Sequence, residues 1–463
     1  MANNIITVKD LRVWFPVRRG FIESILSEEQ RYVKAVDGIS FNIREREIFC
    51  LVGESGCGKT TTGKAILRLV EPTGGEVTYY GPGKDELLEE IAASATSRRR
   101  AGAARVQVAN PERWDEFVEV KNIVNLERAR ASLSDDKIDE ILKKSKIKME
   151  EGDELVLDDV RSEEDKKALK PFTSQVKTNW ITMATVPNEK KDQVLKDAGI
   201  NVRILSKPHM KAMRQKLQII FQDPYESLNP KQSVYDIIAE PLVVNSIGAN
   251  EAEREAKVTK ALEDAGLRPP KAFMWRYPHE VSGGQRQRVG VAGALVLDPD
   301  FLVADEPVSM LDVSIRSEIL KLMLDLREKK GLSFLFITHD LGVAYVFSDR
   351  IGIMYLGKIV ELGPTEKVIK NPQHPYTKAL ISVVPTPDPK DRTDKIILKG
   401  ERPDPSNIPP GCRFHPRCPF MMDICKTEEP KPVFISEGHW VSCHLQKVGQ
   451  SLEQATEETG GAS

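Results

Sequence analysis

Ile48-Phe-Cys-Leu-Val-Gly-Glu-Ser-Gly-Cys-Gly-Lys-Thr-Thr-Thr62 is the stretch that decides the fold. Its first five residues are apolar and predict a buried strand, which runs into a glycine-rich turn and then into a helical pattern. Gly53 to Thr60 fits the pattern G-x-x-x-x-G-K followed by S or T, in which the glycines let several backbone N–H groups point at a phosphate. The sequence therefore predicts a phosphate-binding loop between a strand and a helix.

Each part of this loop has a predicted role in binding a nucleotide. The helix adds its positive N-terminal end, and Lys59 supplies a cation for the β- and γ-phosphates. Thr60 offers a hydroxyl group to Mg²⁺, and Cys57 is a small residue in a tight turn. The residues predicted to contact the nucleotide are Gly53, Ser55, Gly56, Cys57, Gly58, Lys59, Thr60 and Thr61.

A second apolar run, Phe301-Leu-Val-Ala, ends in Asp305-Glu306. A parallel strand here would place Asp305 at the carboxyl end of the sheet, where ligands of open α/β sheets bind. Asp305 could then hold Mg²⁺ directly or through water. Glu306 would be placed to act as the general base that polarises the attacking water.

Length and composition bound the remaining possibilities. The 463 residues suggest roughly three units of about 150 residues each. The formal net charge of −2 argues against a protein that mainly wraps nucleic acid. No run reaches the ~18–20 apolar residues that cross a bilayer, and the N-terminus lacks the layout of a signal peptide. We therefore expect a soluble intracellular polypeptide.

Alternating strands and helices predict an α/β protein with a largely parallel sheet. Residues 84–206 differ from the rest because they are richer in charged residues than the 29% of the whole chain. Ser134 is a candidate N-cap there, and residues 180–186, 188–199 and 201–205 predict a strand, a helix and a strand. We favour a small folded α/β insert over the alternative of a solvated charged excursion.

Four further motifs follow in order, and together with the loop they resemble the nucleotide-binding subunits of ATP-binding-cassette (ABC) transporters. Gln222 matches the Q-loop glutamine, Ser282-Gly-Gly-Gln-Arg-Gln the signature motif, Ser309-Met-Leu-Asp312 the D-loop and His339 the switch histidine. An aromatic residue before the loop normally stacks on adenine in this family. Phe15 is the candidate here, with Tyr32 as the alternative.

The resemblance implies a P-loop NTPase fold with a RecA-like core, an antiparallel β subdomain and a helical subdomain. It also implies a head-to-tail dimer, in which ATP lies between one phosphate loop and the partner's signature. Glu306, His339 and Gln222 would be catalytic, and Thr60, Gln222 and Asp305 would hold Mg²⁺. The residues facing the partner's ATP would be Ser282, Gly283, Gly284, Gln285 and Asp312.

The helix after the signature departs from the family pattern. It carries Gly290 and Gly293 where relatives usually have Ala and Arg. Each mid-helix glycine costs about 0.5–1 kcal/mol relative to alanine. We expect local weakening there without loss of catalysis.

Three other stretches resemble the oligopeptide/dipeptide importer branch, and in particular its F-type ATPase subunit. They begin at Val33, Phe221 and Asn371. The branch implies peptide import, possible oligosaccharide import, a second ATPase subunit in a heterodimer, two permeases, an extracytoplasmic binding protein, and a peripheral location on the cytoplasmic side of the membrane. Alternatives are an ABC ATPase acting on DNA or the ribosome, although this chain has neither two cassettes nor a long coiled coil, and a sensor whose insert binds a regulator.

Four of the six cysteines lie near the C-terminus in the spacing C-x5-C-x6-C-x17-C: Cys412, Cys418, Cys425 and Cys443. Four thiolates can hold Zn²⁺ or an iron–sulfur cluster. Structural zinc prefers closer pairs, so the spacing favours a cluster, and the resemblance implies a 4Fe–4S cluster. Zn²⁺, and a disulfide or no metal at all, stay open as alternatives.

The expected domain boundaries follow from these features. Residues 1–83 and 207–365 would form the ATPase domain and residues 84–206 the insert. Residues 366–448 would form a C-terminal extension with the four cysteines, and residues 449–463 a disordered polar tail.

Overall fold

The computed structural model forms two compact units, residues 1–83 with 202–463 and residues 84–201. Each unit is described by itself. The described residues are 3–17, 31–82, 84–85, 87–88, 105–108, 111–145, 147, 155–182, 186–187, 190, 193–194, 197–384, 395–398 and 400–446. The predicted polar tail, 449–463, lies outside them.

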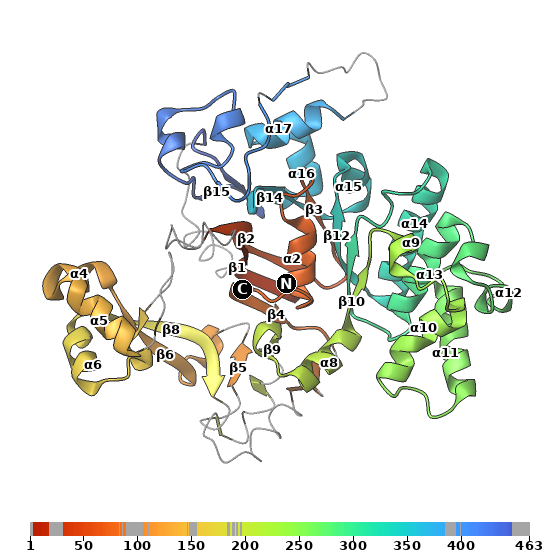
Figure 1. Ribbon diagram of the computed structural model, residues 1–463, viewed down its shortest axis with the longest axis horizontal. Helices are drawn as coiled ribbons and strands as arrows, with labels where there is room; N and C mark the ends of the chain where they lie inside the picture. Colours follow the sequence, from red (N-terminus) through yellow and green to blue (C-terminus); the bar gives the residue numbers. More distant parts are fainter. Residues whose placement is uncertain are drawn as a thin grey trace, which may run out of the picture. The chain divides into compact units, whose positions relative to one another are not determined.

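A parallel sheet forms the centre of the first unit (Figure 1). Its strands pair in the order β10-β11-β12-β3-β13. All residues of β3, β11, β12 and β13 are buried, as expected for continuous apolar runs in a sheet covered on both faces. The bounds are β3 (Ile48–Val52), β10 (Leu217–Ile220), β11 (Phe301–Asp305), β12 (Ser333–Thr338) and β13 (Arg350–Tyr355).

Antiparallel strands complete the first unit. Strand β1 pairs with both β2 and β4, and β13 continues into β14, β16 and β15 through antiparallel pairs. The turn between β13 and β14 contains Gly357. The bounds are β1 (Asn4–Pro16), β2 (Tyr32–Arg44), β4 (Gly74–Tyr79), β14 (Lys358–Pro364), β15 (Pro432–Ser436) and β16 (His439–Ser442).

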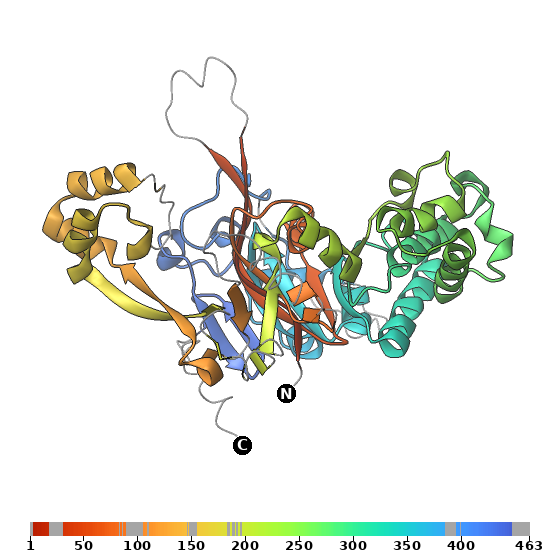
Figure 2. The ribbon, with the colours of Figure 1, turned by 90° about the horizontal axis from the view of Figure 1, so that it is seen from below.

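Helix α2 follows the predicted loop directly, and a group of helices around α10, α11 and α13 gathers to one side of the central sheet (Figures 1 and 2). Helix α13 is continuous through Gly290 and Gly293. The bounds are α2 (Lys59–Ile66), α8 (Lys207–Lys216), α9 (Pro224–Ser227), α10 (Val234–Val244), α11 (Glu251–Asp264), α12 (Lys271–Met274), α13 (Gly283–Leu295), α14 (Val313–Lys330) and α15 (Leu341–Phe347). In the described part of the chain, no helix is both long and apolar enough to cross a membrane.

The second unit, residues 84–201, is a folded α/β unit and not a charged excursion. Its strands pair in the order β9-β5-β8-β6-β7, and an apolar core joins β6 to the three helices. Helix α5 begins directly after Ser134, as predicted. The bounds are β5 (Arg105–Val108), β6 (Val118–Val124), α4 (Leu126–Leu133), α5 (Asp135–Ser145), β7 (Leu155–Val156), α6 (Glu163–Leu169), β8 (Thr173–Thr182) and β9 (Ala198–Asn201).

The prediction of a strand at 201–205 is wrong. The strand is Ala198–Asn201 instead, because Ala198 and Gly199 pair with β5, and Val202–Ile204 forms a 3-10 turn. Of the strand predicted at 180–186, residues 180–182 form the end of the longer β8 and residues 183–185 lie outside the described residues. Much of the helix predicted at 188–199 also lies outside them.

The C-terminal region is fixed to β14 through one buried carboxylate. Glu361 has an exposed fraction of 0%. Its side chain accepts hydrogen bonds from the backbone N–H groups of Gln373 and His374, both at 2.9 Å, and Nε2 of His439 lies 2.9 Å from its Oε1. It therefore joins the start of α17 (Pro375–Ser382) and β16 to the sheet.

Replacing Glu361 by Ala should lower the free energy of unfolding by about 2–4 kcal/mol, because buried donors would lose their charged acceptor. Urea unfolding followed by fluorescence measures the change. Glu366→Ala is the matched control, because Glu366 forms only an exposed ion pair with Lys370. Equal stability of the two variants would contradict the assigned role.

Candidate functional site

A cavity of about 500 Å³ lies at the carboxyl ends of the parallel strands. Residues predicted from several separate motifs meet in it, together with Ala35, which the sequence did not single out. The lining residues are Ala35, Ser55, Gly56, Gly58, Lys59, Thr60, Thr61, Gln222, Glu306 and His339.

The loop between β3 and α2 requires glycine for two different reasons. Gly58 has φ of 108°, which L-residues rarely adopt, and a Cβ there would lie 2.1 Å from the carbonyl oxygen of Ala35. A Cβ on Gly53 would lie 2.2 Å from the carbonyl oxygen of Met354. The loop is thus pressed against neighbouring backbone and cannot form with larger residues at these positions.

Lys59 is buried, and its ammonium group lies inside the curve of the loop. Nζ donates to the carbonyl oxygens of Gly53 at 2.7 Å and Glu54 at 3.1 Å. These bonds hold a positive charge among backbone groups at the N-terminus of α2, an arrangement that attracts phosphate.

Thr60 and Asp305 form the predicted metal-binding pair. The Thr60 hydroxyl donates to Oδ1 of Asp305 at 2.8 Å. Burial raises the pKa of Asp305, while the Thr60 hydrogen bond and the nearby Lys64 oppose that rise. A hydroxyl and a carboxylate oxygen this close are suitable ligands for Mg²⁺, and a cation would favour the ionised carboxylate.

Glu306 joins the other two predicted catalytic side chains. Its Oε2 accepts a hydrogen bond from Nε2 of Gln222 at 3.2 Å and lies 3.1 Å from Nδ1 of His339. The backbone of Glu306 has φ of 44°. Such strain in a non-glycine residue costs of order 1–3 kcal/mol and is typical of functional sites. The result is a carboxylate directed into the cavity and held by two polar neighbours.

The predicted signature residues lie outside this cavity. Ser282 caps α13 through a capping box: its Oγ accepts from the N–H of Gln285 at 3.3 Å, and Oε1 of Gln285 accepts from the N–H of Ser282 at 3.0 Å. Gly283 and Gly284 form the first turn, and a Cβ on Gly284 would lie 2.5 Å from Ile315. Asp312 precedes α14. Ser282, Gly283 and Gly284 thus form the glycine-containing N-terminus of α13, apart from the cavity. Asp312 lies at the N-terminus of a different helix.

The candidate adenine-stacking residues lie at the end of β1 and the start of β2, which pair with each other. Phe15 pairs with Val33, and Tyr32 pairs with Pro16. Both rings are exposed, and neither lines the cavity. Their predicted contact with adenine stays a prediction.

Sequence reasoning missed three C-terminal residues that contact the phosphate loop. The Tyr376 hydroxyl accepts from the N–H of Glu54 at 3.0 Å, Arg417 forms an ion pair with the Glu54 carboxylate, and Arg402 lies against Gly56. These contacts join residues more than 300 positions apart, so no local pattern could reveal them.

The four C-terminal cysteines are free thiols that lie within electrostatic range of one another. Burial raises the pKa of Cys412 to about 12, with smaller contributions from the other three thiols, while a backbone hydrogen bond from Phe414 opposes the rise. Among the residues that the structure describes, no group of three or more His, Cys, Asp or Glu side chains is arranged to hold a metal ion. The four cysteines therefore lie in one region of the fold, but the described residues show no preformed metal site.

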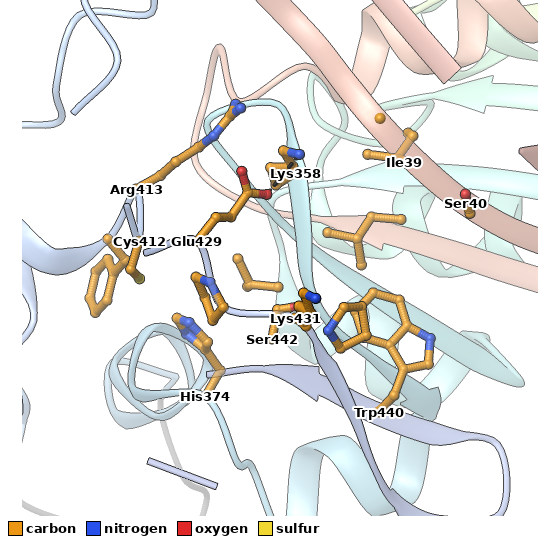
Figure 3. Close-up of a pocket in the computed structure, with 16 residues that line it drawn as sticks. Ile39, Ser40, Lys358, His374, Cys412, Arg413, Glu429, Lys431, Trp440 and Ser442 are labelled. Atoms are coloured by element: carbon orange, nitrogen blue, oxygen red, sulfur yellow. Dashed lines mark ion pairs between the residues drawn. The ribbon is translucent and has the colours of Figure 1, made fainter. Parts of the chain in front are cut away.

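Cys412 also lines a second cavity, of about 480 Å³, between β2, β14 and the C-terminal region. Figure 3 shows Lys358 beside Glu429, with which it forms an ion pair of 2.7 Å, and Trp440 away from that pair. The walls are mainly apolar, and the cavity contains neither the phosphate loop nor the Glu306 group. The nucleotide chemistry therefore belongs to the first cavity.

Two family models match the chain. Residues 36–163 and 178–309 match the ABC transporter model. Residues 360–425 match the model described as the oligopeptide/dipeptide transporter C-terminal region. The first match spans more than half of the chain, and the second includes three of the four C-terminal cysteines, the last of them, Cys425, at its end.

Similar proteins cover nearly the whole chain. The putative oligopeptide transport ATP-binding protein YkfD of Bacillus subtilis is 36% identical over 92% of this chain and 94% of its own length. The dipeptide transport ATP-binding protein DppF of Haemophilus influenzae is 33% identical over 94% of each. Among solved structures, the dimeric ATP-binding cassette MJ0796 bound to ADP and Pi matches with a TM-score of 0.45 and 20% identity, covering 78% of this chain and 99% of that one.

Replacing Lys59 by Ala should weaken the binding of ATP and ADP about 10- to 100-fold, the loss expected for a charge-assisted hydrogen bond of 1.5–3 kcal/mol. Isothermal titration calorimetry with Mg²⁺ present measures it. Lys370→Ala, which removes an exposed ammonium group, is the control. Unchanged affinity in Lys59→Ala would contradict the geometry described for the loop.

Proposed function

This chain belongs to the ATP-binding subunits of the ABC transporter family, and we propose that it couples ATP hydrolysis to the import of oligopeptides or dipeptides. The peptide substrate is supported by the oligopeptide/dipeptide C-terminal match and by the names of the relatives. Members of the family are ATPases that drive transport.

One observation carries the catalytic part of the proposal, the Glu306 carboxylate held between Gln222 and His339. Glu306 accepts a proton from water as the water oxygen bonds to the γ-phosphorus. The bond between that phosphorus and the β–γ bridging oxygen breaks, giving ADP and phosphate. His339 orients the γ-phosphate and water, Lys59 stabilises the phosphate charge, and Thr60, Asp305 and Gln222 would hold Mg²⁺, which neutralises that charge when bound.

The signature residues act on a second nucleotide. Ser282, Gly283, Gly284 and Gln285 present a helix N-terminus, and Asp312 opens the next helix. None of them is among the residues that line the cavity containing Lys59. This position supports a role in binding ATP that is held by another subunit. We infer that the working unit is a dimer of two ATPase subunits, with a related chain as the second subunit.

A groove of about 550 Å³ beside Gln222 suits a permease segment. It is lined by α8, β10, α10 and α13, and Gln287 in its wall is buried with Nε2 unpartnered. A Cβ on Gly290 or Gly293 would meet no atom within 4 Å, so both glycines leave the groove open. A permease segment on the cytoplasmic side of the membrane would dock in this groove and respond to movements of Gln222. The transported solute would reach the permease from an extracytoplasmic binding protein.

The four cysteines would hold a 4Fe–4S cluster. The proposal is supported by the grouping of Cys412, Cys418, Cys425 and Cys443 in one region of the fold. The bound cluster would remove the mutual repulsion of the thiolates and fix this region of the chain.

Glu306→Gln should abolish ATP-driven peptide uptake and turnover while leaving ATP binding intact, because the amide keeps the shape but cannot accept the proton. The transporter purified with its permeases and reconstituted in vesicles provides the assay, and Glu255→Gln on the exposed face of α11 is the control. Sustained turnover in Glu306→Gln would remove its assigned role. Isolation of the chain with ribosomes or DNA, and without permeases, would refute the transport proposal.

Anaerobically purified protein should contain iron and acid-labile sulfide, and Cys418→Ser and Cys443→Ser should each lose both. Metal analysis and electron paramagnetic resonance of the reduced protein measure the effect. Cys57→Ala, in the phosphate loop, is the matched control. Zinc in place of iron in the parent chain would refute the cluster.

A further inference from the structure

We propose that Arg417 of the C-terminal cysteine region is a positioning residue for the phosphate loop: it neutralises Glu54 and holds the loop in the form that binds phosphate. The inference rests on the proposed ATPase function, because it concerns the affinity of the same loop for nucleotide. It assigns a role to a residue whose contact with the loop the sequence did not reveal.

The ion pair between Arg417 and Glu54 is bidentate. Nη1 donates to Oε2 at 2.9 Å and Nη2 donates to Oε1 at 3.2 Å. The side chain of Arg417 is 10% exposed and that of Glu54 is 29% exposed. Although burial opposes it, hydrogen bonding to Glu54 raises the pKa of Arg417. The guanidinium is therefore charged, and its planar fork fixes the carboxylate in one orientation.

Glu54 lies where an uncompensated negative charge would oppose the bound nucleotide. It is the second residue of the loop, and its carbonyl oxygen accepts from Nζ of Lys59, the proposed phosphate cation, at 3.1 Å. An unpaired carboxylate on the loop itself would repel an anionic ligand that the loop binds, and partial burial would strengthen the repulsion. Arg417 cancels that charge without occupying the cavity, because it does not line it.

The backbone of the same loop residue is held from the same side. The N–H of Glu54 donates to the hydroxyl of Tyr376 at 3.0 Å. Tyr376 is buried, and its ring packs against those of Tyr355 and Phe414 at centroid distances of 4.7 and 5.4 Å. Glu54 therefore has both its side chain and its backbone fixed by residues of the C-terminal region and the sheet beneath it.

A second arginine of this region lies on the loop. Nη1 of Arg402 lies 2.8 Å from the position that a Cβ on Gly56 would occupy. Gly56 has φ of 72°, so the absence of a side chain there serves both the turn and the close approach of Arg402. Whereas the charge of Arg417 is balanced by Glu54, Arg402 adds a positive charge beside the loop.

The cysteine region places Arg417. Cys418 follows it directly, and Cys412 precedes Arg413, which forms an ion pair with Asp37 on β2 and donates to the carbonyl oxygen of Leu356. Figure 3 shows Cys412 and Arg413 next to each other beside the second cavity. Arg413 therefore attaches this region to the sheet, and Arg417 attaches it to the phosphate loop.

The test is a double-mutant cycle on the full-length chain, with ATP and ADP affinities measured by calorimetry and KM and kcat measured for ATP hydrolysis. Arg417→Met should weaken nucleotide binding about tenfold, because one partner of a partly buried charge pair is lost. KM should rise while kcat changes little, since Glu306, Gln222 and His339 are untouched. Glu54→Gln combined with Arg417→Met should restore affinity, and Arg417→Lys should recover only part of it.

Arg413→Met is the comparison variant, because it loosens the same region without touching Glu54. Equal weakening by Arg413→Met and Arg417→Met, without restoration by Glu54→Gln, would reduce Arg417 to a structural anchor and overturn the proposal. Unchanged affinity in Arg417→Met would also overturn it. Failure of the parent chain to bind ATP would instead refute the proposed function, so the two failures are distinguishable.

Discussion

Parallel pairing of β3 with β12, and of β12 with β11, is the constraint on which the site depends. The pairing sets Val52 opposite Thr338 and Asp305 opposite Ile337. Because parallel strands end at the same edge of a sheet, the phosphate loop after β3, the carboxylates after β11 and His339 after β12 arrive together. A slip of one residue in either pairing would turn these side chains toward the wrong face.

The sheet edge alone does not complete the chemistry, because the loop and Glu306 both need unusual backbone. Gly58 can adopt φ of 108° without strain, whereas Glu306 has φ of 44° with a full side chain. Glycine removes the strain at position 58. The backbone conformation of Glu306 must instead be stabilised by its surroundings, including the hydrogen bond from its N–H to the carbonyl oxygen of Ile337 at 3.0 Å. The rigid, buried sheet that Glu306 follows holds this conformation in place.

The parts of the site that could be predicted are those coded by local pattern. Lys59, Asp305 and His339 each follow an apolar strand or a glycine-rich turn, so their places followed from the strands. The contact of Arg417 with Glu54 joins residues 363 positions apart, and nothing in either segment specifies the other. In the insert, the apolar run at 201–205 predicts a strand, although such short runs fit several structures. The pairing of β9 with β5, which no local pattern contains, decided the outcome.

The insert is compatible with the ATPase fold because the chain is fixed again in the first unit as soon as it returns. Arg68 donates to the carbonyl oxygen of Leu205, and Arg203 donates to that of Gly75. The residues known to line the nucleotide cavity belong to the first unit, and the insert has a hydrophobic core of its own. Since closing a longer loop between fixed ends costs little additional entropy, a folded module can occupy this position without changing the site. The C-terminal region differs, because Glu54 depends on it directly.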